Sequence, residues 1–212
     1  MQILAHRGWW SVHQPKNSPA ALAAAISAGL GVETDIRDLD GRLVISHDPP
    51  TQAEHVDLDA FLALVARAPR AGTLALNIKA DGLQARLAEQ LAAHGLSDWF
   101  AFDMSVPDLL GWRRRGLPHA VRLSEFEDGG PLLADAGFVW LDAFERDDWY
   151  PNTLIPRLLA QGKRVAVVSP ELHGRHHGVA SAWDRLKNQD DGSGRLMLCT
   201  DLVAQALETF NV

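Results

Sequence analysis

The amino-acid sequence predicts an α/β fold in which eight parallel strands and eight helices close into one (β/α)8 barrel without a large insertion. Short apolar runs alternate with longer Ala- and Leu-rich segments along the whole chain, which is typical of parallel strands joined by helices. There are about eight segments of each kind, and this favours a closed barrel over an open sheet. The 212 residues lie near the short end for such barrels. We therefore expect a single domain over residues 1–212.

Each expected strand is a short apolar run bounded by polar residues, Gly or Pro, as buried parallel strands commonly are. In chain order the runs are Gln2–Ala5, Gly31–Ile36 with a return run at Leu43–Ser46, Thr73–Lys79, Trp99–Asp103, His119–Leu123, Gly137–Leu141, Arg164–Ser169 and Arg195–Thr200.

The expected helices lie between these runs. The segment Ser18–Gly29 has a Ser suited to the N-cap, a Pro in the first turn and a Gly past the end. Several of the others show helical apolar spacing and end at Gly. They are Leu58–Ala68, Asp81–Gly95, Ser105–Gly116, Asp128–Gly137, Pro151–Gly162, Val179–Asn188 and Val203–Phe210.

Composition limits the classes of partner. The net charge of −7 gives no global attraction for nucleic acid or anionic membrane, so an anionic small molecule would need a local cationic site. Cys199 is the single cysteine, which excludes an intrachain disulfide and fits a reducing compartment. No segment approaches the roughly 20 apolar residues of a membrane span, and MQILAHRG does not resemble a signal peptide. We expect a cytoplasmic location; the sequence indicates no oligomeric state.

In barrels of this kind, functional side chains lie at the carboxyl ends of the strands. Polar residues stand at that end of most of the predicted strands, and those on one strand two residues apart face the same way. They are His6 and Arg7, Glu33 and Asp35, His47 and Asp48 after the return run, Asn77 and Lys79, Asp103, Glu171 and His173, and Asp201.

The residue types suggest a chemistry. Glu33 and Asp35 would repel each other if both were buried and ionised, and a hard cation such as Mg²⁺ or Ca²⁺ resolves that conflict. Two His at separate strand ends suit a general acid and a general base, and the nearby cations suit an oxyanion such as phosphate. Salt bridging of the carboxylates, for example to Arg37, is an equal alternative, and Asp103 could instead cap the following helix.

Taken together, the motifs are more specific. HRG, then NS before a helix, then G-x-E-x-D, then DG-x-LVISHD form one ordered string between Ala5 and Asp48. This string resembles the glycerophosphodiester phosphodiesterase family, within the wider group of phosphatidylinositol-phospholipase-C-like barrel phosphodiesterases. The resemblance is strongest over the first quarter of the chain and continues strand by strand after it.

By this resemblance, His6 and His47 are the acid–base pair, and Arg7 and Lys79 contact the substrate phosphate. Three further strand-end residues hold a divalent cation. That cation is Mg²⁺ or Ca²⁺, with Mn²⁺ as a further candidate, and its ligands map to Glu33, Asp35 and Asn77. The implied substrate is a small or sugar-linked phosphodiester, such as a glycerophosphodiester of lipid metabolism. The implied reaction is attack of an adjacent substrate hydroxyl on phosphorus, followed by hydrolysis of a cyclic phosphate.

The sequence departs from the family pattern at two positions. Lys16 stands where the motif before the first helix commonly has Glu, and Asn77 stands where the third metal ligand is commonly Glu. An Asn carbonyl ligates hard cations without a formal charge, so we expect a weaker cation site. Asn77 also leaves two alternatives open: a chemistry with little use of a cation, and a phosphoester-binding barrel that has lost turnover.

Aromatic residues surround the expected site. Trp9 and Trp10 follow HRG directly and should lie beside the site, where they could contact a sugar ring or pack under a loop. Trp149, Tyr150 and Trp183 are expected on later rim loops. Trp99, Trp112 and Trp140 are expected to pack in the core. A last, separate hypothesis is a metal hydrolase that uses the loop with Glu171 and His173, because barrels host many chemistries.

Overall fold

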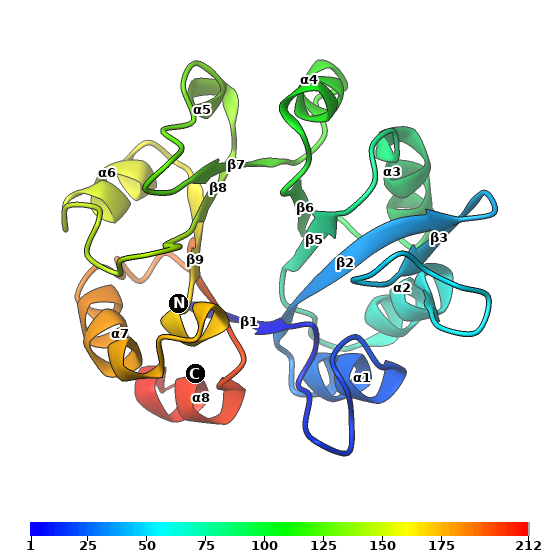
Figure 1. Ribbon diagram of the computed structural model, residues 1–212, viewed down its shortest axis with the longest axis horizontal. Helices are drawn as coiled ribbons and strands as arrows, with labels where there is room; N and C mark the ends of the chain where they lie inside the picture. The colour runs from blue at the N-terminus through cyan, green and yellow to red at the C-terminus, as the bar shows by residue number, and fades with distance from the viewer. Residues whose placement is uncertain (212) are drawn as a thin grey trace. The chain divides into compact units, whose positions relative to one another are not determined.

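The structure is a computed structural model that describes residues 1–211, and the chain forms two compact units (Figure 1). The first unit is Leu4–His119. The second is Met1–Ile3 together with the chain from Ala120 onward. Each unit is an α/β structure in which strands alternate with helices, as the sequence predicts. The single domain expected over residues 1–212 stays a prediction.

The first unit contains six strands and four helices. The strands are β1 (Gln2–His6, which starts in the second unit), β2 (Gly31–Leu39), β3 (Arg42–Ile45), β4 (Val56–Asp57), β5 (Leu74–Ile78) and β6 (Trp99–Phe102). The helices are α1 (Pro19–Ser27), α2 (Leu58–Arg67), α3 (Gln84–Ala93) and α4 (Val106–Arg114).

Strand β2 is the centre of this unit. It pairs in parallel with β1 and β5, and antiparallel with β3. Ile36 lies opposite Ile45 of β3 and Ile78 of β5, so β3 and β5 flank β2 on opposite edges. Glu33 pairs with His6 of β1 as well as with β5. Strands β1 and β3 therefore share one edge of β2: β1 pairs with residues 31–33, and β3 pairs with residues 36–39.

The turn between β2 and β3 explains why the return run is antiparallel. Asp40 and Gly41 have φ values of 49° and 80°, the left-handed conformation that tight hairpin turns require. Gly adopts this conformation without strain, and Asp tolerates it better than most residues. The return run predicted at Leu43–Ser46 is confirmed as β3, which turns back beside the strand that carries Glu33 and Asp35.

Helix α1 begins where its sequence predicts. The Ser18 hydroxyl accepts a hydrogen bond from the Ala21 N–H at 3.2 Å, and Pro19 occupies the first helical position. The chain reaches this helix through Gly8, whose φ is 88°. A Cβ on Gly8 would lie 2.6 Å from the carbonyl carbon of Ala21. Both the positive φ and the close approach to Ala21 therefore require glycine at position 8, where the loop after β1 passes α1.

The second unit has four parallel strands in the order β10-β9-β8-β7. These are β7 (Ala120–Leu123), β8 (Phe138–Leu141), β9 (Arg164–Val168) and β10 (Leu196–Thr200). Its helices are α5 (Leu132–Asp135), α6 (Leu154–Ala160), α7 (Val179–Lys187) and α8 (Val203–Phe210), with two 3₁₀ turns, η1 (Pro170–His173) and η2 (His176–Gly178).

One predicted helix is much shorter than expected. The helix predicted over Asp128–Gly137 is only Leu132–Asp135, because Gly129 and Gly130 have φ values of 73° and 48°. Left-handed residues cannot belong to a right-handed helix, so its first turn is lost.

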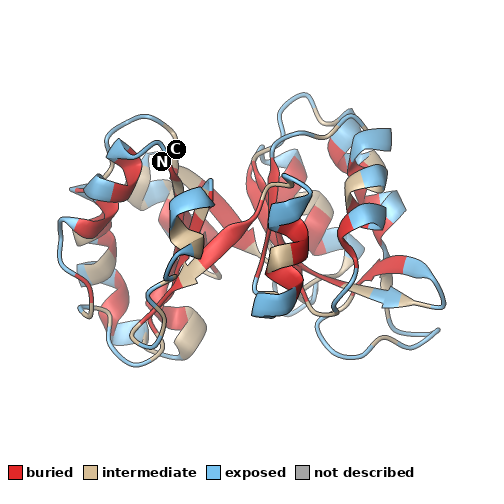
Figure 2. Ribbon diagram, turned by 90° about the horizontal axis from the view of Figure 1, so that it is seen from above, coloured by how far each residue is buried: buried red, intermediate tan, exposed pale blue. Residues whose placement is uncertain are grey.

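Buried residues gather in the strands and on the inner faces of the helices of each unit (Figure 2). Trp99, Trp112 and Trp140 are buried, as predicted. The expectation that Trp183 lies on a rim loop is wrong: it belongs to α7, is 2% exposed, and donates its indole N–H to the Ser169 hydroxyl. A large apolar side chain on the inner face of an amphipathic helix gains more from burial than from a rim position.

Within residues 1–211, no helix combines the length and the apolar character needed to cross a membrane.

Candidate active site

The strand register of the first unit puts the predicted polar residues on one face. Glu33 and Asp35 lie two residues apart on β2 and point the same way. Asn77 of β5 is the direct partner of Asp35, and His6 of β1 is the direct partner of Glu33. Because neighbouring strands carry paired side chains on the same face, these four residues form one cluster across three strands.

Asp35 is at the centre of the cluster and is fully buried. The Asn17 amide donates to its Oδ2 at 2.8 Å, and Arg7 Nε lies 3.1 Å from the same oxygen. The Arg7 contact is an ion pair that is not aligned as a hydrogen bond. Lys79 Nζ lies 3.6 Å from Oδ1. Two cations and an amide therefore offset the burial of this carboxylate, and the alternative pairing with Arg37 is wrong.

Glu33 is also buried, but it has less charge compensation. His6 Nε2 lies 3.9 Å from its Oε2, and the Asn77 amide donates to Oε1 over a long 3.4 Å. Burial raises the pKa of Glu33, and the neighbouring Asp35 carboxylate raises it further, against the lowering effects of His6, Arg7 and Asn77. Because Glu33 is buried beside a second carboxylate, either a bound proton or a bound cation would stabilise it.

Three buried oxygens of this cluster receive no hydrogen bond from residues 1–211: Glu33 Oε2, Asp35 Oδ1 and Asn77 Oδ1. A buried acceptor without a donor is costly. These three atoms belong to the three predicted cation ligands, and hard carboxylate and amide oxygens are what Mg²⁺ and Ca²⁺ prefer. The residues present therefore fit a divalent cation. The described part of the chain has no group of three or more His, Cys, Asp and Glu arranged for a metal; this set has two carboxylates and an amide.

The two predicted acid–base histidines have different surroundings. The His6 side chain is 16% exposed, and its Nδ1 lies 3.4 Å from Lys16 Nζ. Lys16 in turn lies 4.8 Å from the centre of the Trp10 ring. The His47 side chain is 46% exposed, and its Nδ1 lies 2.9 Å from Asp48 Oδ1. Lys16 thus brings a positive charge beside His6.

Backbone hydrogen bonds hold both histidine segments against the same edge of β2. The Arg7 N–H donates to the Glu33 carbonyl at 2.9 Å, and the Ser46 N–H donates to the Asp35 carbonyl at 3.1 Å. His6 and His47 each stand one residue from these anchors. The edge of the strand that carries the two carboxylates is therefore flanked by both histidine-bearing segments.

The sequence pattern does not single out Asn17, although the NS pair before α1 belongs to the motif string. Asn17 accepts from the Thr34 hydroxyl at 2.8 Å while it donates to Asp35, so it orients that carboxylate. Its φ is 59°, and that of Arg7 is 57°. Left-handed non-glycine residues are strained and often occur at functional sites. The paired Asn and Ser after the first strand were the available signal.

Asp103, at the end of β6, joins the cluster through Lys79, whose Nζ lies 3.7 Å from its Oδ2. The alternative that Asp103 caps the next helix is wrong, because the Ser105 hydroxyl accepts the capping hydrogen bond of α4. Trp9 and Trp10 are both half-buried and follow Arg7 in the chain. Their contact with substrate stays a prediction.

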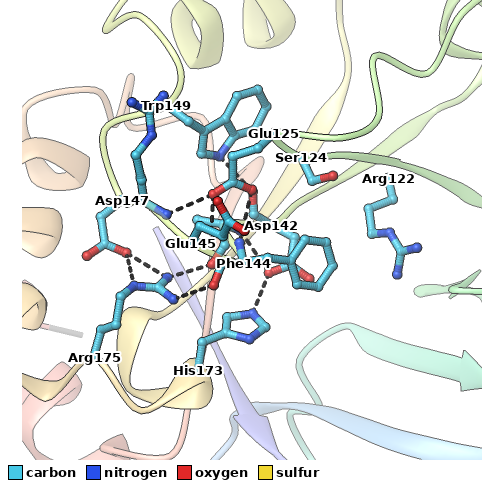
Figure 3. A network of polar contacts seen from close by, with 12 residues as sticks. Arg122, Ser124, Glu125, Asp142, Phe144, Glu145, Asp147, Trp149, His173 and Arg175 are labelled. Carbon is cyan, nitrogen blue, oxygen red and sulfur yellow. Dashed lines mark hydrogen bonds and ion pairs between the residues drawn. The ribbon is translucent and has the colours of Figure 1, made fainter.

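The second unit has a separate polar network, drawn in Figure 3. His173 Nε2 lies 2.7 Å from Asp142 Oδ1, and Arg175 bonds to Asp147 and to two backbone carbonyls of the chain after β8. Glu171 is buried and accepts from the Ser169 hydroxyl, the Thr200 hydroxyl and the Asp201 N–H. Its oxygens are occupied by protein donors, so Glu171 ties the ends of β9 and β10 together. The network braces loops and gives no support to a metal hydrolase at this position.

Glu125 in this network explains how the chain after β8 is held (Figure 3). Burial would raise the pKa of Glu125, but the backbone N–H groups of Arg146, Glu145 and Phe144 hydrogen-bond to its carboxylate and lower that pKa to about 2. The three N–H contacts measure 2.9 to 3.0 Å.

Replacing Glu125 by Gln should therefore lower the free energy of unfolding by about 1 kcal/mol at pH 7, after allowance for solvent screening of this half-exposed group. A carboxylate with a depressed folded pKa stabilises above its unfolded value of 4.5, and that contribution is lost as the pH falls toward 2. Urea unfolding of both proteins should show the difference at pH 7 and a smaller one at pH 3. An equal difference at both pH values would contradict the charge-based explanation.

Comparison with solved structures shows the fold. The chain resembles a glycerophosphodiester phosphodiesterase from Agrobacterium tumefaciens, with a TM-score of 0.69 and 18% identity, over 98% of this chain and 99% of that one. It resembles a phosphodiesterase from Oleispira antarctica, solved with the product sn-glycerol-3-phosphate, with a TM-score of 0.72 and 18% identity, over 100% and 97%. A Parabacteroides distasonis glycerophosphodiester phosphodiesterase gives 0.68 and 15%, over 99% and 96%.

These likenesses confirm the α/β barrel fold that the sequence predicts. They also confirm that the chain resembles glycerophosphodiester phosphodiesterases over nearly its full length. No protein-family model matches the chain, and no curated protein matches it. At this low identity the likenesses show the fold alone, and the chemistry must be argued from the residues.

Proposed function

We propose that this protein is a metal-dependent phosphodiesterase that hydrolyses a glycerophosphodiester or a similar small or sugar-linked phosphodiester. The observation that supports this most is the cluster on β1, β2 and β5. It combines a histidine, two carboxylates and an amide with three buried oxygens that lack donors, within a fold shared with such enzymes. Arg7 and Lys79 stand beside it and suit an anionic phosphoryl group.

In the proposed reaction, a hydroxyl next to the phosphate in the substrate attacks phosphorus. One of the two histidines, His6 or His47, takes the proton of that hydroxyl, and the other protonates the alkoxide that leaves. A cyclic phosphate forms as the P–O bond to the leaving alcohol breaks. Water then opens the cyclic phosphate with the two histidines in exchanged roles. Arg7 and Lys79 stabilise negative charge on the non-bridging oxygens throughout.

The cation would be held by Glu33, Asp35 and Asn77, and when bound it would neutralise the carboxylates and polarise the phosphoryl oxygens. Asn17 keeps the Asp35 carboxylate oriented toward the cluster, because it fixes one of the two oxygens and leaves Oδ1 without a hydrogen-bond donor. Two carboxylates and a neutral amide are a weak ligand set, which favours a cation that is exchanged readily.

The decisive experiment is hydrolysis of glycerophosphocholine, measured as release of sn-glycerol-3-phosphate, with the p-nitrophenyl ester of glycerol 3-phosphate, which keeps the adjacent hydroxyl, as a second substrate. EDTA should lower the rate at least tenfold, and Mg²⁺, Mn²⁺ or Ca²⁺ should restore it. Activity that EDTA does not change would contradict the metal dependence. Binding of the diester without turnover, under all three metals, would favour the alternative of a phosphoester-binding barrel.

A further inference from the structure

Arg37 is a residue of the first unit to which the proposed mechanism gives no role. It follows Asp35 by two residues on β2, so its side chain leaves the same face of the strand as Glu33 and Asp35. The antiparallel register sets Arg37 opposite Val44 of β3. On the other edge, the Lys79 N–H donates to the Ile36 carbonyl, which continues the β5 pairing to the same level. Arg37 therefore lies just past the end of the β5 pairing, but still within the β2–β3 hairpin.

The guanidinium of Arg37 spans the strand. Its Nε and one terminal nitrogen donate to the His47 carbonyl at 3.1 and 3.0 Å, and its other terminal nitrogen donates to the Lys79 carbonyl at 3.1 Å. His47 follows β3 and Lys79 follows β5, so the two acceptors come from opposite edges of β2. One planar side chain thus ties two separate chain segments to the strand that carries both carboxylates.

These contacts begin where the backbone ladder stops. The Ser46 N–H donates to the Asp35 carbonyl and the Lys79 N–H donates to the Ile36 carbonyl, and within residues 1–211 these are the last backbone hydrogen bonds between β2 and either segment near the cluster. Beyond them, the position of His47 depends on the chain Ser46–Asp48 and on what holds its carbonyl. The exposed His47 imidazole has a short contact with Asp48, whose side chain is more exposed still, so the backbone anchor matters most.

We propose that Arg37 is a positioning residue, which fixes His47 and Lys79 relative to Glu33 and Asp35 through their backbone carbonyls. It touches neither substrate nor cation. The kinetic part of this inference rests on the proposed function, whereas the positional part concerns the chain alone. An arginine is required because its fork donates in two directions, which the single ammonium of lysine cannot reproduce.

The first test does not depend on activity. Amide hydrogen exchange of wild-type protein, Arg37→Met, Arg37→Lys and Arg42→Met reports on Ser46 and Lys79 directly. Arg42 is a matched control because it is exposed at the far end of the same hairpin. Exchange at both amides should rise about tenfold in Arg37→Met and Arg37→Lys, with β9 and β10 amides unchanged and Arg42→Met like wild type. Unchanged exchange at either amide, or a uniform rise across all strands, would overturn the proposal.

The second test is kinetic. Arg37→Met should lower kcat/KM for a phosphodiester by about 10- to 100-fold, because a displacement of about 1 Å in a catalytic group is that costly. In the Arg37→Met background His47→Ala should then cost at least about tenfold less than in the Arg42→Met background, where it keeps its full effect. A full effect of His47→Ala in both backgrounds would refute positioning. If the wild-type protein hydrolyses no diester, the proposed function fails, while hydrogen exchange still decides the role of Arg37.

Discussion

Replacement of His6 by Ala is expected to lower kcat for phosphodiester hydrolysis by about 100-fold or more, because a positioned acid or base contributes about that much. His6 is the half-buried histidine of the pair, the direct strand partner of Glu33, and lies 3.4 Å from Lys16. An alanine there removes the proposed proton transfer and leaves Arg7, the proposed phosphate contact, in place. Steady-state kinetics at saturating metal, with substrate varied, would separate a fall in kcat from a change in KM.

The corresponding His47→Ala variant should lose a similar factor, and His94→Ala is the control. His94 is the C-cap of α3, and its Nε2 lies 2.8 Å from Asp59 Oδ1, a residue outside the cluster. Its replacement should leave kcat unchanged. If the His6 and His47 variants both kept full activity, the acid–base assignment would be wrong.

The leaving group distinguishes acid from base. A nitrophenolate departs without protonation, so the variant that lacks the general acid should lose much less activity on the p-nitrophenyl ester of glycerol 3-phosphate, which keeps the adjacent hydroxyl, than on glycerophosphocholine. The variant that lacks the general base should lose the same factor on both substrates only if the same step limits both. Comparing the two ratios for His6→Ala and His47→Ala therefore assigns the roles that the geometry leaves open.

The sequence predicts the fold and the strand-end positions because both follow from short periodic patterns. Glu33 and Asp35, or Asn77 and Lys79, need only the alternation of a strand to share a face. The start of α1 follows from Ser18 and Pro19 in the same local way. Such features depend on neighbours a few residues apart, and the chain obeys them.

Side-chain contacts between distant segments do not follow from local pattern. Asn17 reaches Asp35 across 18 residues, and Arg37 reaches the Lys79 carbonyl across 42. Neither contact is encoded in periodicity, since each depends on the strand register and on where the loops turn. The position of Trp183 does not follow from local pattern for a related reason. An aromatic residue after a loop-rich segment fits either a rim loop or the inner face of a helix, and in the structure Trp183 is buried on α7.

Asn77 is the residue at which the metal hypothesis is tested most sharply. Changing Asn77 to Glu should tighten Mg²⁺ or Mn²⁺ binding by about tenfold or more, which corresponds to about 1.4 kcal/mol. The reason is electrostatic: Asn77 pairs with Asp35 and contacts Glu33, so a carboxylate there would make a third anionic ligand for the cation. Calorimetric titration, or electron paramagnetic resonance of Mn²⁺, measures this affinity without reference to catalysis.

The control is Asn77→Gln, which has the length of Glu and no charge. It separates the effect of a longer side chain in this buried position from that of the added carboxylate. In the absence of metal, Asn77→Glu should melt at a lower temperature than Asn77→Gln, because three neighbouring carboxylates then repel in a buried site. Saturating metal should reverse that order, since a ligand that binds only the folded state raises its stability. Equal metal titrations for the Glu and Gln variants would exclude Asn77 as the third ligand, and would place any bound cation on Glu33 and Asp35 alone.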